Sequence, residues 1–272
     1  MKKLLLILVL AVMCSSVARA SDALDGLDAH HKGNYAEALV LFKAALVNGS
    51  EIGRATAQTM IGVMYKNGQV VKQDYKEAVK WYRKAVAQGY EHAQYQLGFM
   101  YAEGYGVAQD YKESATWYQL AAEQGERGSM RALGTYHYYG HGVAQDYKKA
   151  VKWYRLAAEK GDLDGQTNLG MMYQKGQGVL QNYKEALKWY RLSAEQGSAN
   201  GQYSLGGMYV LGNGVTGDFV LAHMWLNLAA SNGAIKAADA RDLVATGMKP
   251  AEISKAQAMA IDCKEKLYRN CY

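Results

Sequence analysis

The five tryptophans of this chain recur at a fixed interval, and this periodicity constrains the fold more than any other feature of the sequence. Successive tryptophans are 36 residues apart, and two series of glycines keep the same interval. Self-similarity at such a period indicates a solenoid, in which each supersecondary unit buries its apolar face against its neighbours. The positions are Trp81, Trp117, Trp153, Trp189 and Trp225, then Gly68, Gly104, Gly140, Gly176 and Gly212, and Gly89, Gly125, Gly161, Gly197 and Gly233.

Each repeat predicts two helices separated by glycine-marked turns. In Asp110-Tyr111-Lys112-Glu113, the aspartate is placed to accept the first helical N–H groups and Glu113 to reciprocate, which is the spacing of a capping box. The apolar residues that follow recur at helical spacing, and Gly125 supplies a left-handed residue that ends the helix. The same capping residues recur as Asp74 with Glu77 and as Asn182 with Glu185.

The second helix of each repeat carries a Leu-Gly-x-x-Tyr motif. Leu97-Gly98-x-x-Tyr101 is one copy, and the others begin at Leu133, Leu169 and Leu205, with His137 in place of the tyrosine in one of them. A glycine inside a helix costs about 1 kcal/mol relative to alanine, so its recurrence predicts a close approach of two helices there. The recurring tryptophans are interpreted as packing residues between repeats, and Trp153, in the middle of the array, is expected to be buried.

These motifs resemble those of the Sel-like repeat family, the longer-period relatives of tetratricopeptide repeats. The Leu-Gly-x-x-Tyr core is shared with tetratricopeptides, whereas the connector Gly104-x-Gly106-Val107, the Trp-Tyr pair and the step of 36 residues are typical of Sel-like repeats. The resemblance implies an all-α fold, a right-handed α/α solenoid of stacked antiparallel helix pairs. It also implies an adaptor that binds other proteins along its curved surface.

The predicted organisation has four parts. Residues 1–20 are a signal peptide, residues 21–53 hold an N-terminal capping helix (34–49) and a divergent first turn, and residues 234–272 form C-terminal cap helices. Five repeats occupy residues 54–233, at about 54–89, 90–125, 126–161, 162–197 and 198–233.

The first twenty residues have the pattern of a secretory signal peptide. Lys2 and Lys3 precede an apolar run, and Ala18-Arg19-Ala20 is a small-x-small site for cleavage after Ala20. The run is shorter than the roughly 20 residues that cross a bilayer, and Met13 before Cys14 disfavours a lipidated N-terminus. We therefore expect a periplasmic or secreted protein with no integral membrane segment after cleavage.

Charge argues against a nucleic-acid partner. The sequence has 31 basic and 25 acidic residues, and removal of Lys2, Lys3 and Arg19 leaves 28 against 25. This excess is small for a chain of this length, so no nucleic acid is expected.

The sequence predicts no catalytic apparatus, cofactor or metal. It has no His-Glu-x-x-His, Ser-x-x-Lys, Gly-x-Ser-x-Gly or Cys-x-x-Cys motif. The glycine-rich run from Gly212 to Gly217 follows a helix rather than a strand, so it is interpreted as a repeat connector and not a dinucleotide site. His137 and His141 are four residues apart but lack further ligands in local spacing.

Two groups of residues are candidates for binding. Basic triplets on three first helices lie at i, i+4 and i+7, and if the first helices line the inner side they would attract an acidic protein segment or an anionic envelope polymer. A simpler interpretation is a solvated helix face. Varied side chains on the second helices are candidates for selectivity. The residues are Lys76, Lys80, Arg83, Lys148, Lys152, Arg155, Lys184, Lys188 and Arg191, and Tyr95, Arg131 and Tyr203.

We expect the protein to be an exported, non-catalytic scaffold. Exported bacterial members of the Sel-like repeat family bind envelope or host proteins, so the resemblance implies partners of these kinds. An alternative is recognition of a cell-wall glycan or peptide by the tryptophan and tyrosine positions. A third is hydrolysis of β-lactams, proposed for cysteine-rich relatives, whose cysteine pairs this chain lacks.

The cysteines predict one structural feature near the C-terminus. Cys263 and Cys271 are the only cysteines left after cleavage, and export would allow them to form a disulfide. Eight residues of continuous helix span about 12 Å, beyond the ~7 Å limit for bridged Cα atoms. We therefore expect the last helix to break between Lys266 and Asn270.

Overall fold

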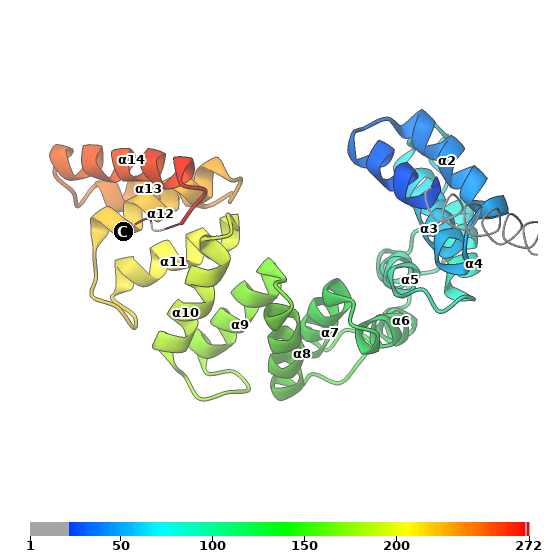
Figure 1. The fold of residues 1–272 in the computed structure, drawn as a ribbon. Helices are drawn as coiled ribbons and strands as arrows, with labels where there is room; N and C mark the ends of the chain where they lie inside the picture. Colours follow the sequence, from blue (N-terminus) through cyan, green and yellow to red (C-terminus); the bar gives the residue numbers. More distant parts are fainter. Residues whose placement is uncertain (1–21, 270, 272) are drawn as a thin grey trace, which may run out of the picture. The chain divides into compact units, whose positions relative to one another are not determined.

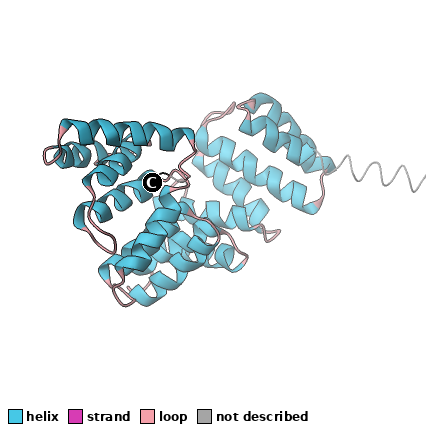
Figure 2. Cartoon of the chain, turned by 60° about the vertical axis from the view of Figure 1, so that its left-hand side comes forward, coloured by secondary structure: helices cyan, strands magenta, loops and turns pink. Residues whose placement is uncertain are grey.

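The computed structural model describes residues 22–269 and residue 271, and the regular secondary structure in that part of the chain is entirely α-helical (Figure 2). The all-α prediction is confirmed. The chain forms two compact units, residues 1–129 and 130–272, and each is described by itself. The predicted signal peptide lies outside the described residues.

Helices of the first unit pack in chain order, each on the next (Figure 1). A helix over residues 22–31 precedes them, and α7 (Arg127–Tyr139) begins at the end of this unit and continues into the second. The other helices are α2 (Tyr35–Asn48), α3 (Glu51–Asn67), α4 (Tyr75–Val86), α5 (Glu91–Glu103) and α6 (Tyr111–Glu123).

The second unit continues the same arrangement from α8 to α12, and α13 and α14 both pack on α12 (Figure 1). The bounds are α8 (Tyr147–Glu159), α9 (Leu163–Lys175), α10 (Tyr183–Ala194), α11 (Ala199–Leu211), α12 (Phe219–Ser231), α13 (Ala237–Ala245) and α14 (Pro250–Glu265).

The N-terminal cap contains one more helix than the sequence predicted. The expected helix at 34–49 is α2, and the helix over residues 22–31 before it was not predicted. Gly26 of this helix lies 36 residues before Gly62 and packs against Phe42 as Gly62 packs against Tyr82, so the helix is a divergent copy of a second helix. Its Ala23 and Ala29 share a buried cluster with Phe42 of α2. The extra residues before the first repeat lengthen α3, whose N-terminus is capped by the Ser50 hydroxyl accepting the Gly53 N–H at 3.1 Å.

The predicted caps account for where the first helices begin. Asp110 Oδ1 accepts the backbone N–H groups of Lys112 and Glu113, both at 2.9 Å. The second half of the expected capping box takes a different form, because the Glu113 carboxylate accepts the indole N–H of Trp117 at 3.0 Å. Asp74, Asn182 and Asp218 cap α4, α10 and α12 in the same way as Asp110 caps α6.

The connector glycines bring each turn against the preceding repeat. Gly104 ends α5 in the left-handed conformation at φ 69°, and Gly106 follows at φ 72°. A β-carbon at Gly106 would collide with the carbonyl of Tyr75 at the start of α4. Only glycine satisfies both the backbone angle and the contact, which explains why this residue recurs in the connectors.

The recurring tyrosine, rather than the tryptophan before it, is the residue that packs against the glycine of Leu-Gly-x-x-Tyr. A β-carbon at Gly170 would lie 2.7 Å from Cε1 of Tyr190, and one at Gly98 would lie 2.8 Å from Cδ1 of Tyr118. The predicted close approach of the helices is therefore present. Gly62 receives Tyr82 and Gly134 receives Tyr154 in the same way, while Gly206 receives Leu226.

The expectation that Trp153 is buried was wrong. Trp153 is half-buried, as are Trp81 and Trp117, whereas Tyr154 beside it is buried. One residue along a helix turns the side chain by roughly 100°, so adjacent tryptophan and tyrosine side chains face different neighbours. Trp189 and Trp225 differ from the other three tryptophans, because they are buried, with 9% and 0% of their surface exposed.

Side-chain amides join the two helices of most repeats at a fixed separation. Gln88 Nε2 donates to Gln58 Oε1 at 2.7 Å, and Asn232 Nδ2 donates to Gln202 Oε1 at 2.9 Å. Gln124 with Gln94 and Gln196 with Gln166 form equivalent pairs. At the equivalent positions of α7 and α8 the sequence has Met130 and Lys160.

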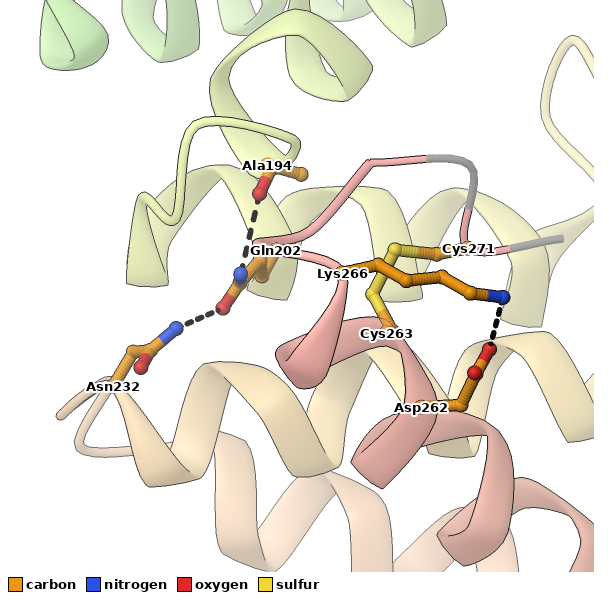
Figure 3. The surroundings of a disulfide bond; sticks show 7 residues. All are labelled: Ala194, Gln202, Asn232, Asp262, Cys263, Lys266 and Cys271. Atoms are coloured by element: carbon orange, nitrogen blue, oxygen red, sulfur yellow. Dashed lines mark hydrogen bonds and ion pairs between the residues drawn. A yellow bond between two sulfur atoms is a disulfide. The ribbon is translucent and has the colours of Figure 1, made fainter.

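The C-terminal end of the chain is closed by a disulfide between Cys263 and Cys271, with 4.8 Å between their Cα atoms (Figure 3). α14 ends at Glu265, and Leu267 and Tyr268 adopt positive φ, so the expected break in the last helix is present. Tyr268 packs against Gly197 and donates its hydroxyl to Asn232 Oδ1 at 3.1 Å. The closed turn thus ties the last helix to the end of the repeat array.

Candidate functional site

The basic triplets lie on α4, α8 and α10, and their lysines are exposed. Lys80 is paired with Glu77 at 2.5 Å. Within the described part of the chain, the recorded ion pairs do not include Lys148, Lys152, Lys184 or Lys188. The Lys188 ammonium lies over the Trp189 ring, 5.7 Å from its centroid, and Lys148, Lys152 and Lys184 are exposed charges available to an anionic partner.

The arginine that ends each triplet has a structural role, because it joins its own repeat to the next one. Arg155 donates to the Tyr173 hydroxyl at 2.6 Å, and Arg83 donates to Tyr101 at 3.1 Å. Arg191 and Tyr209 form the third pair, at 3.3 Å. Each tyrosine belongs to a Leu-Gly-x-x-Tyr motif, so these contacts join a first helix to the second helix that follows it.

The second-helix candidates differ in how far they are available. Tyr95 is half-buried, with its ring centroid 5.7 Å from that of Tyr118. Arg131 is ion-paired with Asp162 at 3.1 Å, at the N-terminus of α9. Tyr203 is 37% exposed on α11. Tyr203 also lines a hollow on the surface.

Adjacent repeats contact each other through a first helix and the second helix that follows it, as α4 does with α5 and α10 with α11. Second helices of adjacent repeats also contact each other, α3 with α5 and α9 with α11. The placement of the first helices on an inner side stays a prediction.

A groove of about 360 Å³ lies between α9, α11, α12 and α13. Tyr203, Gly207 and Leu211 of α11 line it, facing Leu243 of α13, and Leu211 and Leu243 are 65% and 72% exposed. The polar side chains on its surface are those of Gln174 and Ser204 as well as the Tyr203 hydroxyl, and no lining residue is charged. An uncharged, mostly apolar hollow with a few hydrogen-bonding groups is the usual character of a binding pocket.

A half-buried hydrogen bond orients Gln174 in this groove. The Tyr190 hydroxyl donates to Gln174 Oε1 at 2.7 Å. Burial raises the pKa of Tyr190, so this hydroxyl stays protonated and remains a donor. The Gln174 carbonyl oxygen is thereby held toward α10, and its amide nitrogen is left as the donor at this site.

A second hollow of about 530 Å³ lies at the N-terminus of α12. Its carboxylates are already used, because Asp218 caps α12 and Glu252 accepts the Lys249 N–H at 2.8 Å. The hollow therefore has no free acidic group from these two residues.

The described residues were compared with what a metal site or a membrane-spanning helix requires. No cluster of histidine, cysteine and carboxylate side chains among them could hold a metal ion. His137 Nδ1 lies 3.4 Å from the Ala144 carbonyl, a contact within its own connector. A search of the same residues finds no helix long and apolar enough to cross a membrane.

Three of the five tryptophans have their rings in packing contacts. Trp225 is buried, Trp189 belongs to a core cluster with Tyr154, and the Lys84 ammonium covers the ring of Trp81 at 3.9 Å. These contacts use the indole rings for packing, which weakens the glycan alternative.

The sequence analysis identified Tyr203 but missed the groove around it. Two departures from the repeat pattern could have revealed it. Gly207 stands where the equivalent second helices have Val63, Phe99, Thr135 and Met171. Leu211 stands where they have Asn67, Glu103, Tyr139 and Lys175.

Comparison with protein families matches the Sel1 repeat five times, over residues 55–90, 91–126, 128–162, 163–198 and 199–233. No curated protein sequence matches the chain significantly.

Solved structures show the same relationship. A Sel1 repeat protein from Oxalobacter formigenes is 30% identical with a TM-score of 0.74, and the alignment covers 89% of this chain and 97% of that one. The protein c5321 of uropathogenic Escherichia coli, a protective antigen with an SLR fold, is 36% identical with a TM-score of 0.69 over 85% of this chain. The present chain spans about half of that protein, 51% of its length. The immunity protein Pa5087 of Pseudomonas aeruginosa, at 19% identity and a TM-score of 0.50, shares the fold alone.

Proposed function

Because the chain belongs to the Sel1 repeat family, whose members are generally scaffolds for protein interactions, we propose that it is an exported, non-catalytic scaffold that binds another protein. The observation that supports this most directly is that recurring side chains pack the array, whereas side chains that vary between repeats lie at its surface. Recurring residues hold the array together, as Tyr190 does against Gly170 within one repeat and Arg155 does with Tyr173 between two repeats. Positions that vary between repeats, such as Tyr203, remain at the surface.

Export and the class of partner are parts of the same proposal. The pattern of the first twenty residues supports export to the periplasm or beyond. The related Escherichia coli protein is described as a protective antigen, which supports envelope or host proteins as partners. The exposed Lys148 and Lys152 support an acidic segment, or an anionic envelope polymer, as part of what is bound.

Photocrosslinking in living cells tests the scaffold proposal. A photoreactive phenylalanine derivative is placed separately at Tyr203, Tyr139 and Lys148, which are all exposed and in the second unit. We expect an adduct heavier than the protein alone from at least one position, containing peptides of a second protein. If all three positions give no protein adduct in cells that express the chain, the proposal fails.

Isolated peptidoglycan sacculi separate the scaffold from the glycan alternative. We expect the purified protein to stay in the supernatant when sacculi are sedimented and to be retained by a matrix carrying envelope proteins. Co-sedimentation with sacculi from which protein has been stripped would favour recognition of a cell-wall glycan or peptide instead. Turnover of a reporter β-lactam would contradict the absence of catalysis.

Charge reversal tests the contribution of the basic helices. Lys148→Glu with Lys152→Glu on α8 is compared with Lys249→Glu and Lys255→Glu near and on α14, which are also exposed. Arg155 is left unchanged because its bond to Tyr173 is structural. A loss of partner adduct confined to the α8 variant would support an acidic partner, whereas equal effects would leave these lysines as a solvated face.

Export has its own measurement. Mass spectrometry of the protein from the periplasm or medium is expected to find an N-terminus at Ser21. A mature protein that retains Lys2 and Lys3 in the cytoplasm would contradict export without affecting the binding proposal.

A further inference from the structure

The groove on α11 is hollow because one side chain is missing from the repeat pattern. Gly207 takes the place of Phe99 in α5 and Met171 in α9. A β-carbon built at Gly207 meets no other atom within 4 Å, unlike one at Gly206, which would lie 2.9 Å from Cγ of Leu226. Packing therefore does not require glycine at 207, although glycine costs about 1 kcal/mol inside a helix. Phe99 and Met171 place a large side chain at this position, whereas Gly207 leaves the position open.

Apolar side chains surround this open space. Leu211, Leu243 and Tyr203 are 65%, 72% and 37% exposed. Burial of apolar surface stabilises a complex by about 25 cal/mol per Å², so binding of a group that covers these three side chains is favourable. Other repeats have Asn67, Glu103, Tyr139 and Lys175 at the position of Leu211, so an aliphatic side chain here is particular to this site.

One hydrogen-bond donor faces the hollow. With Gln174 Oε1 occupied by the Tyr190 hydroxyl at 2.7 Å, the amide nitrogen of Gln174 has no partner within the described part of the chain. Donors of this kind bind the carbonyl oxygen of a peptide bond.

A carboxylate lies beside the apolar rim. Asp239 precedes Leu243 by four residues on α13, which places both on one face of the helix. Asp239 is exposed, and the ion pairs recorded among the described residues do not include it. Arg241 and Asp242 of the same helix pair with each other at 2.7 Å, so Asp239 is the acidic group left to attract a positive charge from outside.

We propose that this groove binds a segment of a partner protein that inserts one large uncharged side chain, aromatic or like that of methionine, above Gly207. A backbone carbonyl of the segment accepts the Gln174 amide, and a lysine or arginine of the segment lies beside Asp239. The chemistry of the anchor follows from Phe99 and Met171, which occupy the equivalent place in other repeats. This assignment rests on the proposed scaffold function and specifies the kind of partner segment that it takes.

The test uses a phage-displayed library of random peptides as the probe. Peptides are selected on the purified wild-type protein, and the enriched sequences are synthesised and their affinities measured. We expect each to contain an aromatic residue or methionine with a lysine or arginine within a few positions. Affinity is then compared among wild type, Gly207→Met, Leu211→Asn and Asp239→Lys.

Gly207→Met should lower the affinity at least tenfold, because the new side chain occupies the hollow as Met171 does in α9. The variant should fold at least as stably as wild type, since methionine favours a helix over glycine and the site has room for it. Asp239→Lys should weaken binding and reduce its dependence on salt. Leu180→Asn, which removes an apolar side chain that is 91% exposed elsewhere in the second unit, should leave affinity unchanged.

Two results would overturn the assignment. One is that selected peptides bind Gly207→Met as tightly as wild type, and the other is that selection enriches no peptide with the expected anchor. Photocrosslinks from Tyr139 or Lys148 without any from Tyr203 would leave the scaffold function standing while rejecting this groove. Absence of protein adducts from all three positions would instead reject the scaffold function itself.

Discussion

Two helical glycines in different surroundings provide a sharp test of how this array is packed. Gly170 lies in α9 and Gly207 in α11, and both are inside a helix. Replacement of either by alanine adds one methyl group and removes the same intrinsic penalty, about 1 kcal/mol, that glycine imposes on a helix. Only the surroundings of the added methyl group differ.

At Gly170 the added carbon would lie 2.7 Å from Cε1 and 2.8 Å from Cδ1 of Tyr190, a ring that is buried in the core of the second unit. Overpacking of this kind costs about 1 to 3 kcal/mol, which offsets the gain in helix propensity and leaves a net loss of up to about 2 kcal/mol. At Gly207 the carbon meets nothing within 4 Å, so Gly207→Ala should gain up to about 1 kcal/mol.

The propensity gain cancels in the comparison, so the two variants should differ by the overpacking cost alone, about 1 to 3 kcal/mol in the free energy of unfolding. Urea unfolding followed by circular dichroism measures this difference. In a Tyr190→Leu background, which copies Leu226 of the next helix pair, Gly170→Ala should cost less because the ring is gone. Equal midpoints for the two single variants would refute the close approach of α9 and α10.

Three further outcomes are expected from the structure. Trp225→Ala should destabilise the protein by about 3 to 5 kcal/mol and half-buried Trp153→Ala by clearly less, and a larger loss for Trp153 in urea unfolding would contradict the burial pattern. Reduction of the Cys263–Cys271 bond, which closes a short loop at a separation of 8 residues, should lower the stability of the C-terminal cap by about 2 to 3 kcal/mol, and thiol titration of the unreduced protein lacking the leader should find no free thiol. Burial lowers the pKa of His223 below its usual 6.5, so below pH 6.5 the unfolded chain binds more protons than the folded protein does. The free energy of unfolding should therefore fall as the pH drops through 6.5. A pH profile of unfolding that His223→Gln leaves unchanged would contradict this.

Much of the fold could be predicted from the sequence because it depends on contacts within one repeat or between identical repeats. The caps at Asp110 and Asn182 act over three residues, and the left-handed glycines such as Gly104 end helices locally. The break after Glu265 followed from the reach of a disulfide over eight residues. Periodicity then propagated these local rules along the chain.

The helix over residues 22–31 lay outside the reach of that argument. Gly26 of this helix does keep the period, 36 residues before Gly62, but the residues around it depart from the Leu-Gly-x-x-Tyr motif. Its Ala23 and Ala29 become buried in a cluster with residues of α2 and α3, and small residues such as these provide a weak sequence signal.

The sequence by itself determined the repeat, the helix ends and the residues that pack, but tertiary structure decided which of those residues face inward and where a surface is left open. Tryptophan and tyrosine recur equally at positions 153 and 154, yet only the tyrosine is buried, because the direction of a side chain depends on how its helix is rotated against the next one. The groove at Gly207 likewise arises from α9, α11, α12 and α13 together. Period and spacing describe one helix at a time, whereas a hollow is defined by the gaps between several helices once they have packed.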